Sequence, residues 1–221
     1  MAPSPNPTAG SEPRPAQADA APARVVLDDT AIRRALVRIA HELVEHNDRL
    51  GDLYLVAIPN GGVPLARAIA ANLQQIAGLE VPVGILDTTL YRDDLVLRGE
   101  RPPLRRTEMP SAVDGRVVVL VDDVVSTGRT IRAAMDALMD FGRPQAVQVV
   151  GLVDRGHREL PIKIDYVGKN IPTQRDERVE LRGLQGGLEG PLEVVVKPER
   201  SEGDHRARGR AEGAPGEGGS R

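Results

Sequence analysis

The sequence predicts an α/β domain with a mostly parallel, twisted sheet flanked by helices. Short apolar runs alternate with helical patterns along the central part of the chain, as in sheets built with right-handed crossovers. One apolar run, Val117 to Val121, ends in two adjacent aspartates and is followed by two valines, a Ser-Thr-Gly turn and a helical pattern. Because parallel strands in such sheets end at the ligand crevice, this transition predicts a binding site.

The 221 residues accommodate one such domain between two extensions of different composition. Residues 1–24 are rich in Pro, Ala and Ser, and residues 199–221 are rich in Gly, Arg and Glu. Neither segment shows the apolar periodicity needed to offset its ordering entropy, so we expect both to be disordered. The globular domain is therefore expected to occupy residues 25–198.

The individual elements follow from the spacing of apolar residues and turn formers. Apolar positions 32, 36, 39 and 43 are four, three and four residues apart, which predicts an amphipathic helix starting near Asp29. The pattern continues with strand 53–58, helix 63–76, strand 81–88, a charged loop at 91–110, helix 129–141, strand 146–153 and small strands at 166–167, 179–181 and 192–196. A loop of that length in a compact domain is usually functional or mobile.

Composition argues against several classes of protein. The chain has no cysteine, so it has no disulfide framework and no thiolate zinc site. It shows neither a secretory signal pattern nor an apolar run of membrane-spanning length, which predicts a cytoplasmic protein without membrane contact. A formal net charge of −3, one Phe and no Trp argue against a general nucleic-acid binder or a base-stacking platform, but leave room for a local basic face.

The residues that follow the apolar run at 117–121 indicate a sugar-phosphate site. Unpaired N–H groups at a helix start attract phosphate, and Gly128 lets the backbone approach closely. The threonines and the arginine around it add hydroxyl donors and positive charge. Asp122 and Asp123 would repel a phosphate, so ribose hydroxyls or a metal are their expected partners. For an Asp-Asp pair alone, acids that merely cap the helix are the simpler alternative.

The run from Val117 to Thr130 resembles the phosphoribosyl-pyrophosphate (PRPP) motif of type I phosphoribosyltransferases. Together with segments 31–43, 87–95 and 153–173, it resembles the PyrR family, bacterial regulators of pyrimidine operons that are also uracil phosphoribosyltransferases. Tyr-Arg-Asp-Asp-Leu at 91–95 and Asp-Arg-Gly-His-Arg-Glu-Leu-Pro at 154–161 are specific to this family within the superfamily. The resemblance implies a type I phosphoribosyltransferase fold with a small hood and a long flexible loop.

The resemblance also implies a reaction in which uracil and PRPP give UMP and diphosphate, with Mg²⁺ held mainly by PRPP oxygens and water. The implied catalytic residues are Asp122 and Asp123 at the ribose hydroxyls, and Arg92, which would reach the pyrophosphate when the loop closes. Taken alone, Arg92 is more simply a solvated loop charge. The implied PRPP-binding residues are Asn60, Gly61, Val124, Val125, Ser126, Thr127, Gly128, Arg129 and Thr130, and the implied uracil-binding residues are Lys169, Asn170 and Ile171.

A second implied function is RNA binding. In the family, the form with bound uridine nucleotide (UMP or UTP) grips a hairpin in the leader mRNA of the pyrimidine (pyr) operon and favours termination, through a basic face of a homodimer or dimer of dimers. The matching positions are Arg34, Arg38, His41, Arg155, His157, Arg158 and Lys163. Most of these would meet phosphates, which give affinity rather than sequence reading. Any one of the helix charges alone is more simply part of a solvated face.

The chain departs from the family pattern at three points. Asn60 and Gly61 stand where relatives usually carry Thr-Arg, whose arginine contacts pyrophosphate. Losing such a charge-assisted contact costs about 1.5–3 kcal/mol, or roughly ten- to hundredfold in PRPP use. Val125-Ser126 replaces a common Leu-Tyr, which looks tolerable, and Val37 replaces a polar residue on the RNA side of the first helix.

These departures leave two hypotheses open. The first is a bifunctional transferase and RNA-binding regulator, favoured by the intact acid pair and Thr-Gly-Arg-Thr run. The second is a nucleotide-sensing regulator with weak or lost transferase activity, favoured by Asn60-Gly61. A purine-type transferase without RNA function is a third reading, and the two family-specific segments argue against it.

Overall fold

The computed structural model describes residues 22–59, 61–93, 106–183 and 190–199. The expected disordered extensions fall almost entirely outside these residues, as do Asn60 and most of the long charged loop. The structure places Arg24, the last residue assigned to the N-terminal extension, in a strand. Within the described ranges, no helix has both the length and the apolar character that a membrane crossing requires.

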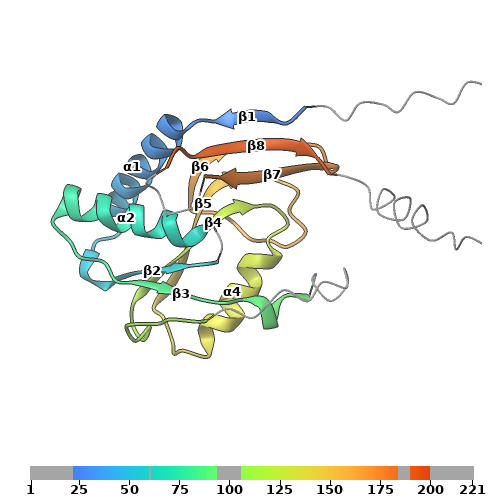
Figure 1. The fold of residues 1–221 in the computed structure, drawn as a ribbon. Coiled ribbons are helices and arrows are strands. Elements are labelled where there is room, and N and C mark those ends of the chain that lie inside the picture. The colour runs from blue at the N-terminus through green and yellow to red at the C-terminus, as the bar shows by residue number, and fades with distance from the viewer. Residues whose placement is uncertain (1–21, 60, 94–105, 184–189, 200–221) are drawn as a thin grey trace, which may run out of the picture.

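The centre of the molecule is a five-stranded sheet in which every neighbouring pair is parallel (Figure 1). Its strand order is β3-β2-β4-β5-β6. The strands are β2 (Leu53–Ala57), β3 (Val83–Ile85), β4 (Val117–Val125), β5 (Ala146–Asp154) and β6 (Tyr166–Asn170). The predicted α/β class and parallel sheet are confirmed.

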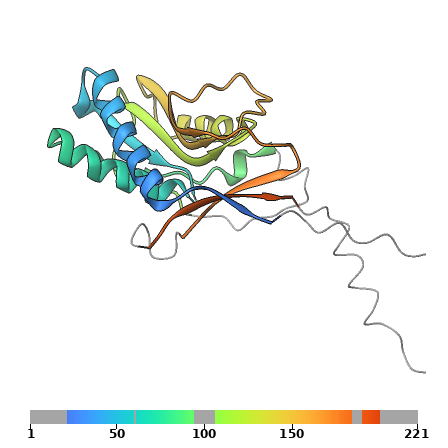
Figure 2. The same ribbon diagram turned by 90° about the horizontal axis from the view of Figure 1, so that it is seen from above.

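Helices cover both faces of this sheet because the central strands are apolar on both sides. Helices α1 (Asp29–His46) and α2 (Gly62–Ala77) pack together on one face, and α4 (Arg129–Met139) packs on the other (Figures 1 and 2). Along β4, Val119 and Val121 join the core under α1 and α2, whereas Val118 and Leu120 join the core under α4. Two short 3-10 turns, η1 (Leu50–Asp52) and η2 (Thr89–Tyr91), precede β2 and the long loop.

A second, smaller sheet forms the hood that the resemblance implied. It consists of β1 (Arg24–Leu27), β8 (Glu193–Pro198) and β7 (Glu177–Arg182), all antiparallel. Figure 1 shows it above the parallel sheet, with β1 leading directly into α1. Val179, Val194 and Val196 continue the core that α1 begins, so the hood and the main sheet share one hydrophobic interior.

Several strands differ in length from their sequence prediction, β3 and β4 the most. β4 runs through Val125 and therefore includes both aspartates, because Asp122 pairs with Gly151 and Val124 with Val153 of β5. β3 covers only residues 83–85 of the predicted 81–88. The longer β4 matters for the site, since it holds the acid pair on a strand rather than on a loop.

Candidate active site at the carboxyl edge of the parallel sheet

The predicted site residues gather where the parallel strands end. In the strand register, Val125 lies beside Asp154, and Asp154 lies beside Asn170, which aligns the ends of β4, β5 and β6. The turn from β2 into α2 reaches the same edge, because Gly61 contacts Asp123. Four segments that are distant in sequence therefore meet at the edge where such sheets bind ligands.

Asp122 and Asp123 are held next to each other in a largely water-free setting. Asp122 is 5% exposed, and burial raises the pKa of its carboxyl well above the usual range. The charge of Asp123 and a side-chain hydrogen bond with it raise the Asp122 pKa further. Burial also raises the pKa of Asp123, although the hydrogen bond with Asp122 opposes that shift. Asp122 is therefore the member of the pair that retains a proton at higher pH.

The backbone fixes the orientation of both carboxyls. Asp122 Oδ1 accepts a hydrogen bond from the Asp123 N–H at 3.0 Å, and Asp123 Oδ1 accepts one from the Val124 N–H at 2.9 Å. The other oxygen of Asp123 faces Gly61, where an added Cβ would lie only 2.3 Å from Oδ2. The site therefore has no room for any side chain at position 61 unless Asp123 moves.

The loop between β4 and α4 has the conformation of a phosphate-binding turn. Gly128 adopts φ 92° as the N-cap of α4, a left-handed conformation that favours glycine. The Thr127 carbonyl accepts hydrogen bonds from the N–H groups of Glu159 and Leu160 at 3.0 and 3.2 Å. The first N–H groups of α4 have no acceptor within the helix. They are thus suited to bind an anion.

The Arg129 guanidinium is paired with two carboxylates of the protein. Its Nη1 lies 2.8 Å from Asp93 Oδ2, and its Nε lies 2.8 Å from Glu159 Oε2. Both carboxylates raise the pKa of the guanidinium. The sequence assigned Arg129 to PRPP binding through its charge, but the structure commits that charge to two acids.

Arg92 lies close to the acid pair. It follows η2 directly, and its positive charge lowers the pKa of Asp122. The first part of the long loop is thus on the site side of the sheet edge. Residues 94–105 of the predicted loop at 91–110 lie outside the described residues.

The three residues predicted to bind uracil lie at the end of β6. Lys169 and Asn170 are exposed, whereas Ile171 is 7% exposed and belongs to the hydrophobic core. The Ile171 N–H donates to the Asp154 carbonyl at 2.8 Å, which anchors this end of β6 to β5. The backbone and two polar side chains of this segment are thus accessible at the sheet edge, while the Ile171 side chain packs in the core and anchors the segment.

Comparisons with known proteins agree with this geometry. Residues 25–183 match the family described as the phosphoribosyl transferase domain. The bifunctional protein PyrR of Roseiflexus sp. is 57% identical over 167 residues, which cover 75% of this chain and 91% of the relative. PyrR of Pelotomaculum thermopropionicum is 57% identical over 171 residues, which cover 77% of this chain and 93% of the relative. The chain belongs to the PyrR family.

Solved structures show the same fold at much lower identity. The hypoxanthine phosphoribosyltransferase of Trypanosoma cruzi superposes with a TM-score of 0.58 at 19% identity, covering 80% of this chain and 97% of that chain. A hypoxanthine-guanine phosphoribosyltransferase from Bacillus anthracis gives a TM-score of 0.55 at 17% identity, covering 67% and 84%. These structures confirm the type I phosphoribosyltransferase fold.

The residues that the PyrR resemblance assigns to RNA fall into two groups. Arg34, His41 and Lys163 have exposed side chains on α1 and on the segment before β6. The other four have partners within the protein. Arg38 Nη2 donates to the carbonyls of Val167 and Gly168 at 2.9 and 2.8 Å, which fastens α1 to the edge strand β6.

The remaining three assigned residues brace the segment 154–162, which we call the collar. Arg155 donates to Thr173 Oγ1 at 3.0 Å and to the carbonyls of Gln174 and Glu177, the second of which begins β7. His157 Nε2 lies 2.7 Å from the Thr173 carbonyl. Arg158 donates to the Ile162 carbonyl at 2.9 Å, to the Ser126 and Gly156 carbonyls and to Asp154 Oδ2 at 2.9 Å.

Sequence reasoning missed this structural function of Arg158. With the Glu159 and Leu160 N–H groups, its guanidinium holds two successive carbonyls of the phosphate loop, those of Ser126 and Thr127, on the collar side. The sequence signal that was present is the spacing of Asp154 and Arg158, four residues apart. That spacing suggests a local ion pair but does not show that the arginine reaches another loop.

The acid pair fits a magnesium site shared with a ligand better than a site made of protein alone. Among the described residues, no group of three or more acidic, histidine or cysteine side chains is placed to enclose a metal. Mg²⁺ typically takes one or two carboxylates and completes its shell with substrate phosphates and water. Asp122 and Asp123 provide such oxygen ligands.

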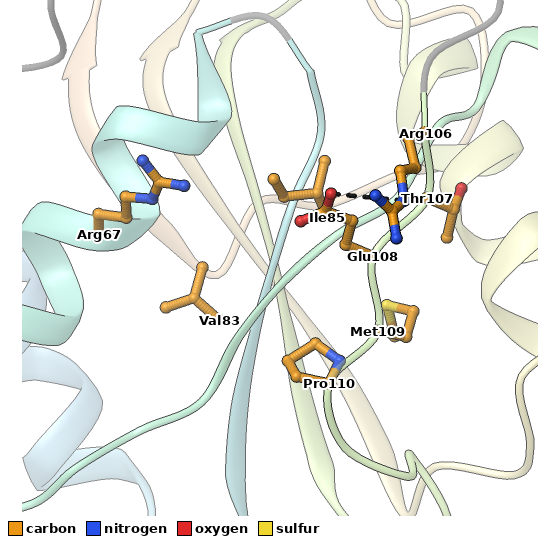
Figure 3. A pocket seen from close by; sticks show the side chains of 8 residues that line it. All are labelled: Arg67, Val83, Ile85, Arg106, Thr107, Glu108, Met109 and Pro110. Atoms are coloured by element: carbon orange, nitrogen blue, oxygen red, sulfur yellow. Dashed lines mark ion pairs between the residues drawn. The ribbon is translucent and has the colours of Figure 1, made fainter.

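A cavity of about 450 Å³ lies apart from the acid pair, between α2, β3 and the segment 106–110. Figure 3 shows Arg67 of α2 directed toward this space from one side and Arg106, paired with Glu108 at 3.6 Å, on the other. Its lining includes none of the predicted site residues. The predicted site therefore lies at the strand edge, apart from this cavity.

Proposed function

We propose that the protein transfers the phosphoribosyl group of PRPP to uracil, forming UMP and diphosphate, and that its uridine-nucleotide-bound form regulates a pyrimidine operon by transcription attenuation. The observation that carries this proposal is the buried acid pair of β4, placed on the same sheet edge as the phosphate loop, in a member of the PyrR family. The cytoplasm is the proposed compartment for both activities.

In the proposed reaction, N1 of uracil forms a bond to the anomeric carbon of PRPP while the bond from that carbon to the pyrophosphate oxygen breaks. The N1 proton is released to solvent. Charge develops on the ribose ring and on the leaving group, so positioning and electrostatic stabilisation supply most of the catalysis. Asp122 and Asp123 hold the ribose hydroxyls, and their proximity stabilises a positive ring.

The remaining groups of the site have complementary tasks. The backbone from Val124 to Thr130 wraps the 5′-phosphate, with Gly128 allowing the close approach. Arg92 meets the pyrophosphate, and loop closure excludes the water that competes with uracil. Backbone groups of residues 169–171 read the edge of uracil. Mg²⁺ would be held mainly by the PRPP oxygens and water, and would supply positive charge to neutralise the pyrophosphate.

A nucleotide sensor with weak transferase activity is the second candidate, and position 61 favours it. Relatives usually supply an arginine there, whereas Gly61 supplies no charge and packs against Asp123. Substituting Gly61 by Arg would be a poor test of this idea, because the new Cβ would displace a site carboxylate. Direct measurement of turnover is cleaner.

The RNA-binding proposal places phosphate contacts at the three exposed positions, Arg34, His41 and Lys163. Arg38, Arg155, His157 and Arg158 instead maintain the surface that these residues occupy. A homodimer or dimer of dimers would double this basic face for a leader-mRNA hairpin. Arg158 also joins that surface to the phosphate loop, which gives nucleotide binding a direct physical route to the RNA face.

Base competition tests the proposed transferase. With PRPP and Mg²⁺, we expect diphosphate release to require uracil, and added hypoxanthine to leave the rate unchanged. A rate supported by hypoxanthine and not by uracil would favour the purine-type alternative and would remove the basis for a pyrimidine regulator.

A further inference from the structure

Helix α4 contacts both residues that flank Arg92. The Tyr91 hydroxyl donates a hydrogen bond to Asp140, just beyond the end of α4. Arg132 Nη2 donates to the Tyr91 carbonyl at 3.0 Å. At the start of α4, Arg129 pairs with Asp93 at 2.8 Å. We call these three contacts the α4 latch.

The latch fixes the position of the backbone that carries the Arg92 side chain. Because Tyr91 is held through its hydroxyl and its carbonyl, and Asp93 through its carboxylate, the backbone between them has little freedom to move away from α4. From this position the Arg92 charge acts on Asp122, where it partly opposes the rise in the carboxyl pKa that burial and Asp123 cause.

The latch is also joined to the phosphate loop. Arg129 contacts Glu159 through Nε at the same time as Asp93 through Nη1. The Glu159 N–H in turn donates to the Thr127 carbonyl at 3.0 Å. One side chain therefore connects the base of the long loop, the collar and the loop that would bind the 5′-phosphate.

We propose that Arg132, Asp140 and Arg129 are positioning residues that set Arg92 over the acid pair for the pyrophosphate of PRPP. This inference rests on the proposed transferase function, in which Arg92 meets pyrophosphate. It assigns a positioning function to the side of α4 that faces η2. Of its three residues, the sequence had singled out only Arg129. The latch acts through Arg92 and touches no substrate itself.

A comparison of PRPP binding with UMP binding separates a positioning effect on Arg92 from general damage to the protein. PRPP carries the pyrophosphate that Arg92 meets, whereas UMP does not. We expect Arg132→Met to weaken PRPP binding about tenfold, in line with the loss of one hydrogen bond from a charged donor, and to leave UMP binding within about twofold of wild type. Calorimetric titration with Mg²⁺ present measures both. Tyr91→Phe, which loses only the Asp140 contact, should show the same split.

Two controls keep the result specific. Asp136 also pairs with Arg132, its Oδ2 lying 3.3 Å from Arg132 Nη2, and its side chain is 52% exposed. Asp136→Asn should leave the affinities for PRPP and for UMP unchanged. Arg132→Lys, which can still donate toward the Tyr91 carbonyl, should recover part of the PRPP affinity. Equal losses of PRPP and UMP affinity in Arg132→Met would overturn the proposal, because they would indicate damage to the whole site.

A double variant provides the decisive comparison. If the latch acts only through Arg92, Arg92→Ala combined with Arg132→Met should bind PRPP no more weakly than Arg92→Ala alone. Fully additive losses would contradict the latch. If the wild-type protein binds PRPP but forms no UMP, the transferase proposal is refuted, and the difference between PRPP and UMP affinities still tests the latch. If the wild-type protein binds no PRPP, the transferase and the latch are both refuted.

Discussion

The Asp123 side chain occupies the space that a side chain at position 61 would need. Gly61 is buried and has an ordinary helical backbone, so its requirement for glycine arises from the 2.3 Å that an added Cβ would leave to Asp123 Oδ2. The absence of a side chain at position 61 thus leaves the space that the Asp123 carboxylate occupies.

This contact gives a prediction for the smallest possible substitution. Gly61→Ala should lower kcat/KM for PRPP by roughly tenfold or more, because small displacements of catalytic groups have large effects on rate. Gly51→Ala is the matched control, since an added Cβ at Gly51 would meet no atom within 4 Å. Steady-state kinetics of the two variants decide the matter, and a Gly61→Ala enzyme as active as wild type would refute the proposed packing.

Asp122 gives a pH-dependent stability prediction. Its folded pKa is raised by burial, so between the unfolded value near 3.8 and the raised folded value the folded state binds the extra proton. Stability is therefore lost as pH rises through that interval. We expect Asp122→Asn to stabilise the free protein at pH 7 by about 1 kcal/mol or more, equivalent to about 2–4 °C in Tm per kcal/mol.

The stabilising effect of Asp122→Asn should be clearly smaller at pH 4 than at pH 7, because near the unfolded pKa of 3.8 the unfolded carboxyl also begins to bind the proton that the folded one holds. Thermal unfolding at the two pH values measures it, with the exposed Asp48→Asn as a control for general charge removal. A destabilised Asp122→Asn protein at pH 7 would show that the ionised carboxylate is favourable in the free site.

At the scale of elements, the collar and the phosphate loop behave as one unit. Arg158 reaches across to the Ser126 carbonyl and back to its own segment, and two collar N–H groups hold the Thr127 carbonyl. The loop is thus held in a conformation that leaves the start of α4 open to a phosphate. A segment whose residues the sequence assigned to RNA binding therefore supports the loop at the start of α4.

Removing the Arg158 guanidinium should weaken nucleotide binding. We expect Arg158→Met to reduce UMP affinity about tenfold, since the Ser126 carbonyl loses its charged donor and the loop loses its support. Arg175→Met, at an exposed arginine outside the collar, is the control. Unchanged UMP binding in Arg158→Met, measured by calorimetry, would mean that the loop holds its shape without the collar.

The order and type of the main elements were predictable because they depend on local patterns. The spacing of apolar residues located α1, and the turn at Gly128 located the start of α4. Strand β1 was missed, since its four residues gain their partner only from β8, almost the whole chain away. The extension of β4 through the aspartates was missed for the same reason, as pairing with β5 and not apolar composition continues it.

The site was predictable in its membership and not in its contacts. Asp122 and Asp123 stood out because two acids at the end of an apolar strand are unusual. The partners of Arg129, Arg158 and Arg132 lie on segments that the sequence does not place beside them. The sequence therefore assigned Arg129 and Arg158 to ligands, whereas the structure shows both paired within the protein.

At the scale of the whole molecule, the proposed activities occupy adjoining surfaces. The acid pair lies at the carboxyl edge of the central strands, and α1 lies beside the edge strand β6, fastened there by Arg38. The cavity near Arg67 lies at the opposite edge, beside β3. An RNA bound along α1 and β6 would thus be close to the nucleotide site and far from this cavity.

This arrangement predicts which charges RNA should use. With UMP present, affinity for a pyrimidine-leader hairpin should fall with salt. Arg34→Ala or Lys163→Ala should each reduce the slope of log K against log salt by about 0.7–0.9, the value for one lost phosphate contact. Arg67→Ala on the far edge should leave the slope unchanged. Equal effects of all three substitutions, measured by filter binding, would indicate diffuse attraction in place of a defined face.

The rate of UMP formation from uracil, PRPP and Mg²⁺ tests the central claim most directly. The protein is compared with its Asp123→Asn variant, which keeps the shape of the site and removes one carboxylate. We predict turnover in the wild type that is well above that of the variant, with UMP and diphosphate formed in equal amounts. A wild-type rate no higher than that of Asp123→Asn, in protein that still binds UMP, would contradict the transferase and leave a nucleotide sensor.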